Sequence, residues 1–126
     1  GAGDPEGATE AFYQGISGPG WRKVLTSVDP SALDRITRHA RIFFELEAKA
    51  VLAYPFTEQS AKAVTQPVLF VVSDRGADRS AMLRAQFKSW MPQTRQLLVK
   101  DADHLLSLQQ PSQIAEGIRG FLSAGR

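Results

Sequence analysis

Two patterns of apolar positions divide the chain. In the first half, apolar residues recur every three or four positions, as on one face of an amphipathic helix. The longest such run is formed by Leu33, Ile36, Ala40, Phe43, Phe44 and Val51. Asp-Pro pairs at positions 4–5 and 29–30 are typical helix starts, because aspartate caps free backbone N–H groups and proline fits the first turn. We therefore expect residues 1–66 to be helical, with the long run bending or splitting near His39 to Ile42.

The second half has a pattern that predicts two strands and two helices. Val68 to Val72 is a continuous β-branched and aromatic run, typical of a strand that is buried on both faces of a parallel sheet. A shorter run, Gln96 to Val99, follows a helical stretch that stops before Pro92, and Pro111 begins a last helix. Strands separated by a helix indicate a parallel pair joined by a crossover. The predicted fold class is α/β, with the polar segment Ser73 to Arg79 as a loop.

Composition and charge exclude several classes of protein. The 126 residues are 43% hydrophobic and 22% charged, as in a globular protein of one domain at most. The longest apolar run is too short to span a bilayer, the first residues do not read as a signal peptide, and the absence of cysteine excludes disulfides and thiolate metal sites. The net charge is only +2, and Arg35, Arg38 and Arg41 are typical of a solvated helix face. We expect a cytoplasmic protein with neither a nucleic acid nor a membrane as partner.

The second half of the chain resembles the closing part of the α/β-hydrolase fold. In that family a strand like Pro67 to Val72 is the penultimate one, and a helix and a short strand follow it. A loop then carries a histidine, followed by apolar residues, a Gln-Pro or Glu-Pro pair and a final helix. Here the loop reads Asp101-Ala102-Asp103-His104, and the pair is Gln110-Pro111. The resemblance implies the C-terminal portion of an α/β-hydrolase fold: a helical cap-like region over 1–66 and a parallel β-α-β-α unit over 67–126.

His104 falls where this family places its catalytic base. It comes just after a predicted strand, at the end where α/β sheets bind their ligands. In that role the imidazole takes a proton from a serine-type hydroxyl and later gives one to the leaving group. A histidine of a surface loop is the alternative interpretation. His39, within an expected helix, is given no chemical role.

The family's nucleophile has no counterpart in the sequence. Its Gly-x-Ser-x-Gly turn follows a strand, whereas the nearest string here, Gly15-Ile16-Ser17-Gly18-Pro19, follows a helix and ends in proline. We interpret Ser17 as a turn residue. Since nucleophile, acid and histidine occur in that order in this fold, a C-terminal portion keeps the histidine and lacks the serine. The resemblance therefore implies that the chain alone is inactive.

The acid of a triad has two candidates after the first predicted strand. Many family members carry an aspartate a few residues after this strand, but Gly76 occupies that place here, between Asp74 and Asp78. We prefer Asp78, although it is also suited to cap the next helix. An acid from the end of an earlier strand is the third possibility.

Four aromatic residues are candidates for an apolar substrate pocket under the cap: Phe43, Phe44, Tyr54 and Phe56. At helical spacing such residues are also typical of an ordinary core, and both interpretations stay open. Asp101 and Asp103 look like a metal-ligand pair, but no third ligand has suitable spacing. We expect neither a metal nor a cofactor.

Two functions from different classes are consistent with this sequence. The first is a part of a serine-type hydrolase that acts on an ester or a related small apolar substrate, with the missing N-terminal half as its partner. The second is a non-catalytic hydrolase-like module that dimerises or docks onto a partner chain. The second follows from the two-stranded sheet, which leaves strand edges and apolar faces uncovered.

Overall fold

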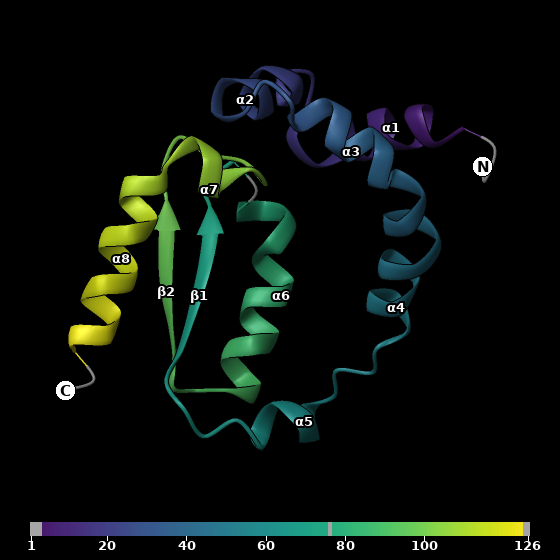
Figure 1. Cartoon of the computed structure of the whole chain (residues 1–126). Helices are drawn as coiled ribbons and strands as arrows, with labels where there is room; N and C mark the ends of the chain where they lie inside the picture. Colours follow the sequence, from purple (N-terminus) through teal and green to yellow (C-terminus); the bar gives the residue numbers. More distant parts are fainter. Residues whose placement is uncertain (1–3, 76, 125–126) are drawn as a thin grey trace. The chain divides into compact units, whose positions relative to one another are not determined.

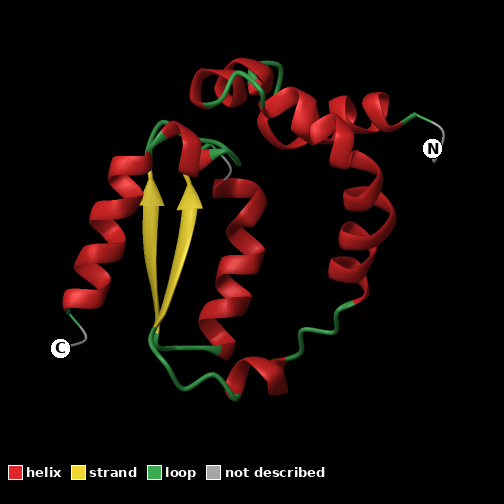
Figure 2. Ribbon diagram, in the orientation of Figure 1, coloured by secondary structure: helices red, strands yellow, loops and turns green. Residues whose placement is uncertain are grey.

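The computed structural model describes residues 4–75 and 77–124, without the side chains of residues 77–80. The chain divides into two compact units, Gly1–Pro55 and Phe56–Arg126. Described residues of the first unit form helices, and the second unit combines helices with a two-stranded sheet (Figures 1 and 2). The chain is thus α/β in character. No described helix is long and apolar enough to cross a membrane.

The first unit begins with two helices whose ends agree with the sequence signals. The Asp4 carboxylate accepts a hydrogen bond from the Gly7 amide at 2.8 Å and so caps α1 (Pro5–Ser17). Gly18 ends this helix with a φ of 72°, a conformation that glycine adopts without strain. The next helix, α2 (Trp21–Val28), buries Trp21 against the ring of Tyr13, with 4.7 Å between ring centroids. Ser17, which we expected in a turn, is the last residue of α1.

The long apolar run of the first unit is interrupted by a π-helix. The segment begins as α3 (Ala32–Ile42), widens into a π-helix, η1 (Phe43–Glu47), and ends as α4 (Ala48–Ala53). The interruption starts directly after the range in which we expected a bend. Val51, predicted on the apolar face, is 74% exposed. A π-turn holds more residues than an α-turn, and side chains after it therefore leave the face that the earlier ones share.

The second unit is built around two parallel strands. A short helix, α5 (Glu58–Lys62), precedes β1 (Val68–Ser73), and α6 (Ala77–Trp90) connects β1 to β2 (Thr94–Val99). The strands pair in parallel from Val68↔Thr94 to Ser73↔Val99, which confirms the predicted crossover. Two helices complete the unit, α7 (Leu106–Gln109) and α8 (Pro111–Ser123). The division at residue 55 assigns α5 to the second unit, although the predicted cap-like region extended to residue 66.

Helices α6 and α8 pack on opposite faces of the sheet. The ring of Phe70 on β1 lies 5.3 Å from that of Phe87 on α6, between centroids. On the other face, a Cβ atom at Gly117 of α8 would lie only 2.3 Å from a methyl group of Leu97 on β2. Because neighbouring residues of a strand point to opposite faces, these contacts place the two helices on either side of β1 and β2 (Figure 1). Glycine at 117 permits the close approach of α8.

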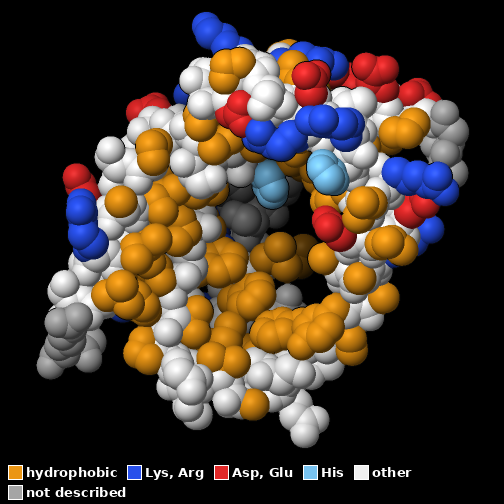
Figure 3. Space-filling view, viewed as in Figure 1, with side chains coloured by type: hydrophobic (Ala, Val, Ile, Leu, Met, Phe, Trp, Pro, Cys, Tyr) orange, Lys and Arg blue, Asp and Glu red, His pale blue; other side chains and the backbone are white. Residues whose placement is uncertain are grey.

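The second unit leaves much apolar surface uncovered. Its exposed large hydrophobic residues include Met82 (81%), Leu83 (53%), Leu98 (44%) and Leu122 (61%). Figure 3 shows hydrophobic side chains gathered in the open over the strands and α8. Each strand has one edge without a neighbouring strand in the described part of the chain. Such edges and patches are typical of surfaces that another polypeptide covers.

Candidate functional site

The carboxyl ends of the two strands bring two predicted site segments together. Asp74 follows β1, and the loop with His104 follows β2 on the same side of the sheet. The Asp74 amide donates to the Val99 carbonyl at 3.0 Å, and the Arg75 amide donates to the Ala102 carbonyl at 3.2 Å. The hydrogen-bonded contact between the chains therefore continues past the strands, and the loop after β1 supports the loop after β2.

The Asp74 carboxylate binds the loop that leads to His104. It accepts hydrogen bonds from the amides of Asp101 at 2.9 Å, Ala102 at 3.1 Å and Arg75 at 2.8 Å. The amides of Asp101 and Ala102 hold the pKa of this carboxyl below its usual range, since they stabilise the charged form. Ala102 itself is fully buried. Asp74 thus joins two loops that are 27 and 28 residues apart in the sequence.

Two glutamines hold the same loop from the helices that follow it. Gln113 of α8 accepts from the Lys100 amide at 3.1 Å and donates to the Lys100 carbonyl at 3.2 Å. Gln109 of α7 accepts from the Asp103 amide and donates to the Asp103 carboxylate, both at 2.8 Å. The loop is therefore anchored at Lys100 and Asp103 as well as through Asp74.

His104 lies in the turn between this anchored loop and α7. Its neighbours are fixed, because the Leu105 amide donates to the Asp103 carboxylate at 2.8 Å. The imidazole itself is exposed, and within the described residues it makes no hydrogen bond or ion pair. The backbone is fixed on both sides of His104, so a rigid loop presents a solvent-facing ring.

Asp101 adopts a backbone conformation that is uncommon for its residue type. Its φ is 56°, in the left-handed region, which aspartate tolerates better than most side chains do. The Asp101 amide is one of the donors to Asp74. The hydrogen bond therefore holds the backbone at a turn that the chain would not otherwise favour.

The second acid candidate, Asp78, is not in the loop where the sequence analysis put it. Helix α6 starts at Ala77, so Asp78 belongs to the first turn of the helix rather than to its cap or to the preceding loop. An acidic residue in a first turn suits the positive end of the helix dipole. The Asp78 side chain lies outside the described residues, and its part in a triad stays a prediction.

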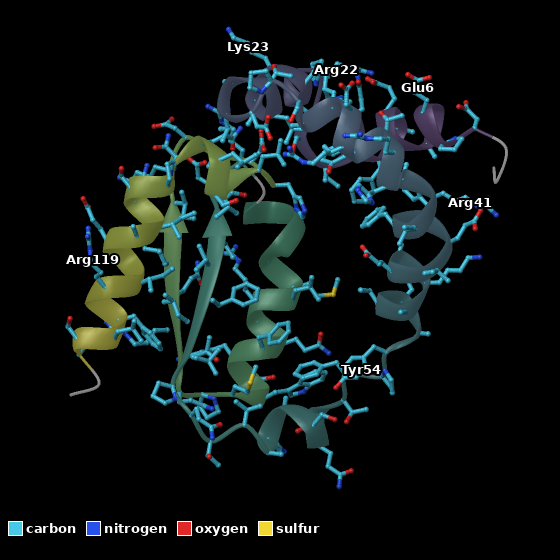
Figure 4. The ribbon with its side chains drawn as sticks, viewed as in Figure 1. Glu6, Arg22, Lys23, Arg41, Tyr54 and Arg119 are labelled. Carbon is cyan, nitrogen blue, oxygen red and sulfur yellow. The ribbon has the colours of Figure 1, made fainter. Side chains whose placement is uncertain are left out.

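The four aromatic candidates fall into separate groups. Phe43 and Phe44 contact each other at 5.0 Å between ring centroids and both contact Phe12 within the first unit. Tyr54, at the end of α4, is 68% exposed (Figure 4). Phe56 belongs to the second unit and stacks on Phe87 at 5.6 Å. Phe44 also lines a hollow of about 290 Å³ in the first unit, together with Ala8 and Lys49 among others.

The described residues contain no group of three or more histidine, aspartate or glutamate side chains that could hold a metal ion. The polar side chains at the sheet end bind backbone groups instead. Their arrangement can fix the position of an imidazole, which can accept and donate protons near neutral pH. It offers the second unit a base on a rigid support.

Sequence reasoning missed Gln109 and Gln113 as functional candidates. Gln109 was part of the motif that carried the resemblance, but no role was given to it. Helix α7, which presents Gln109, was not expected either, because four residues are too few for a helical pattern. A glutamine in each helix after the histidine loop was the available signal.

Comparison with known proteins adds one similarity. No family model matches the chain, and no solved structure matches it. The chain is 33% identical over 73 residues to "Carboxylesterase YbfK" of Bacillus subtilis (strain 168), which is 57% of this chain and 25% of that protein. The chain thus spans about a quarter of the length of this curated relative. This weak similarity hints at the α/β-hydrolase superfamily and at a hydrolase-like origin of the chain.

Proposed function

We propose that this chain is part of a serine-type α/β-fold hydrolase that acts on an ester or a related small apolar substrate. The observation that carries the proposal is the anchored loop at the carboxyl end of two parallel strands, with His104 exposed at its tip. The similarity to a carboxylesterase supports the same reaction class. The resemblance of the sequence to the closing part of the hydrolase fold gives His104 the role of base.

In the proposed mechanism His104 moves one proton in each half of the reaction. The imidazole accepts the proton of a serine hydroxyl as the serine oxygen bonds to the ester carbonyl carbon. It then returns the proton to the leaving alkoxide as the carbon–oxygen bond breaks. The serine and the oxyanion donors belong to a segment outside this chain, and Asp78 or an acid of an earlier strand orients the imidazole. The chain alone is therefore inactive.

A hybrid enzyme tests the proposal. The segment of Bacillus subtilis carboxylesterase YbfK that matches this chain is replaced by the matching residues of this chain, and hydrolysis of short nitrophenyl esters is measured. We expect activity within about 100-fold of the parent carboxylesterase, since a small displacement of a catalytic group costs roughly this factor. A hybrid that folds, by circular dichroism and thermal unfolding, but exceeds free imidazole in no assay would contradict the proposal.

Uncovered apolar surface favours a second candidate, a non-catalytic module that dimerises or docks onto a partner chain. The exposed Met82 and Leu83 of α6 and the unpaired edges of β1 and β2 support it. This function predicts that the 126-residue chain forms a dimer at micromolar concentration. Size-exclusion chromatography with light scattering measures this directly, and a well-folded monomer at all concentrations would count against self-association.

A further inference from the structure

Resting on the proposed function, we propose that Asp74 is a positioning residue that shapes the His104 loop, and that it is not the acid that orients the imidazole. The two roles differ in what the carboxylate binds. A triad acid accepts a hydrogen bond from the imidazole, whereas a positioning residue binds the backbone that carries the histidine. The partners of Asp74 belong to the second kind.

The partners of the Asp74 carboxylate in the described structure are backbone amides. One oxygen accepts from Arg75 and Ala102, and the other accepts from Asp101. A carboxylate has about four acceptor positions, so these three bonds occupy most of its capacity. The donors Asp101 and Ala102 lie just ahead of His104 in the chain, and their bonds set the path of the loop.

The backbone at Asp101 shows why the loop needs this support. With a φ of 56°, Asp101 has a conformation that costs free energy for a residue with a side chain. A loop without the carboxylate would lose the bond that holds this residue and would leave two amides without their acceptor. Gln109 and Gln113 hold other points of the loop, so Asp74 is specifically responsible for Asp101 and Ala102.

Protonation of Asp74 gives the same inference a pH dependence. The folded pKa lies below the unfolded one, so the stabilisation is complete above the ordinary aspartate pKa and is lost as pH falls through the folded value. Arg75 is the charged neighbour that also favours the ionised carboxylate, and Asp101 is the nearby acid of the bonded loop. Loop opening on acidification is therefore expected below about pH 4.

The experiment uses Asp74→Asn in the 126-residue chain and follows individual amides by NMR. Asparagine keeps the shape of the side chain but replaces one acceptor oxygen by a donor, which opposes the Asp101 or Ala102 amide. We expect hydrogen exchange at Asp101 or Ala102 to accelerate by about tenfold or more, as for a local opening that has become easier by one factor of ten. The midpoint of the His104 imidazole titration should stay unchanged.

Glu116→Gln serves as the matched control. Glu116 is an exposed acid of α8 without a hydrogen bond or ion pair in the described structure, so its variant removes the same charge from the same unit. We expect wild-type exchange at both amides in this variant. In the wild-type chain, the amide shifts of Asp101 and Ala102 should titrate together below about pH 4.

Two results would overturn the inference: unchanged exchange at both amides in Asp74→Asn, or a downward displacement of the His104 titration, as expected when an orienting carboxylate is lost. In the hybrid carboxylesterase, Asp74→Asn should lower kcat and leave KM nearly unchanged, since a misplaced base affects the chemical step. The amide measurements need no activity. An inactive hybrid would therefore contradict the proposed function while the role of Asp74 is still decided.

Discussion

Replacing His104 by glutamine in the hybrid carboxylesterase is expected to lower kcat by about 1000-fold, with little change in KM. Glutamine has a similar reach and can hydrogen-bond, but it cannot accept the serine proton at neutral pH. General acid–base catalysis by a positioned side chain contributes roughly 10²- to 10⁴-fold, and His104 supplies both proton transfers. Steady-state kinetics on a short nitrophenyl ester measure the effect.

His39→Gln is the control for this experiment where the transferred segment includes residue 39, and otherwise in stability measurements on the 126-residue chain. His39 is an exposed residue of α3, and the proposed reaction gives it no role. We expect its variant to behave as the parent does. A His104→Gln hybrid that retains a kcat within a few fold of the parent would remove His104 from the mechanism.

The second large effect is expected at Gly117, where α8 approaches β2. Gly117→Leu should destabilise the chain by about 1–2 kcal/mol, measured by urea unfolding. The atoms of a side chain here meet those of Leu97, since even a Cβ atom would lie 2.3 Å from its Cδ2. Forcing extra methylenes into such a contact costs about 1–3 kcal/mol, and the better helix propensity of leucine offsets up to about 0.8 kcal/mol of it.

Gly120→Leu is a control in the same helix. No atom lies within 4 Å of a Cβ atom at Gly120, so leucine there meets open space. We expect this variant to be as stable as the wild type or more stable by up to about 0.8 kcal/mol. Adding Leu97→Ala to Gly117→Leu should recover part of the loss, because it removes the opposing methyl groups. A Gly117→Leu chain that gains as much stability as Gly120→Leu would contradict close packing of α8 on the sheet.

The elements with a strong local signal were predictable from the sequence. The Asp-Pro pair at residues 4–5 and the glycine at 18 are the physical causes of the ends of α1, and both could be read directly. The run at Val68–Val72 predicted a buried strand, and the intervening helix predicted parallel pairing with the next one. Each of these signals depends on residues that are close in the sequence.

The helix starts and the wide turn were less predictable, because they depend on a balance of several interactions. Helix α6 begins at Ala77 rather than after Asp78, although aspartate is a good cap. The π-helix at Phe43–Glu47 has no residue signature of its own, and packing of Phe43 and Phe44 on Phe12 accompanies it. Local propensity alone does not include such packing.

The candidate site was predicted as a set of residues but not as a set of bonds. The position of His104 after a strand followed from the motif, and Asp74 was one of two acids considered. The hydrogen bonds from Asp74 to amides 27 and 28 residues away depend on the parallel pairing of β1 and β2. Side chains that bind backbone carry no pattern in the sequence, and the two glutamines were overlooked for this reason.

The wide turn at Phe43–Glu47 also affects how the chain compares with its relatives. A residue of an α-helix advances by about 100°, so one additional residue in a turn rotates everything after it by about that angle. A homologue with a regular helix in this place would need a gap of one residue in its alignment with this chain. Deleting a single residue from the turn would likewise rotate Val51 and Leu52, both exposed now, to another side of the helix without changing either amino acid. Insertion and deletion, rather than substitution, are therefore the changes by which evolution can alter the surface that α4 presents.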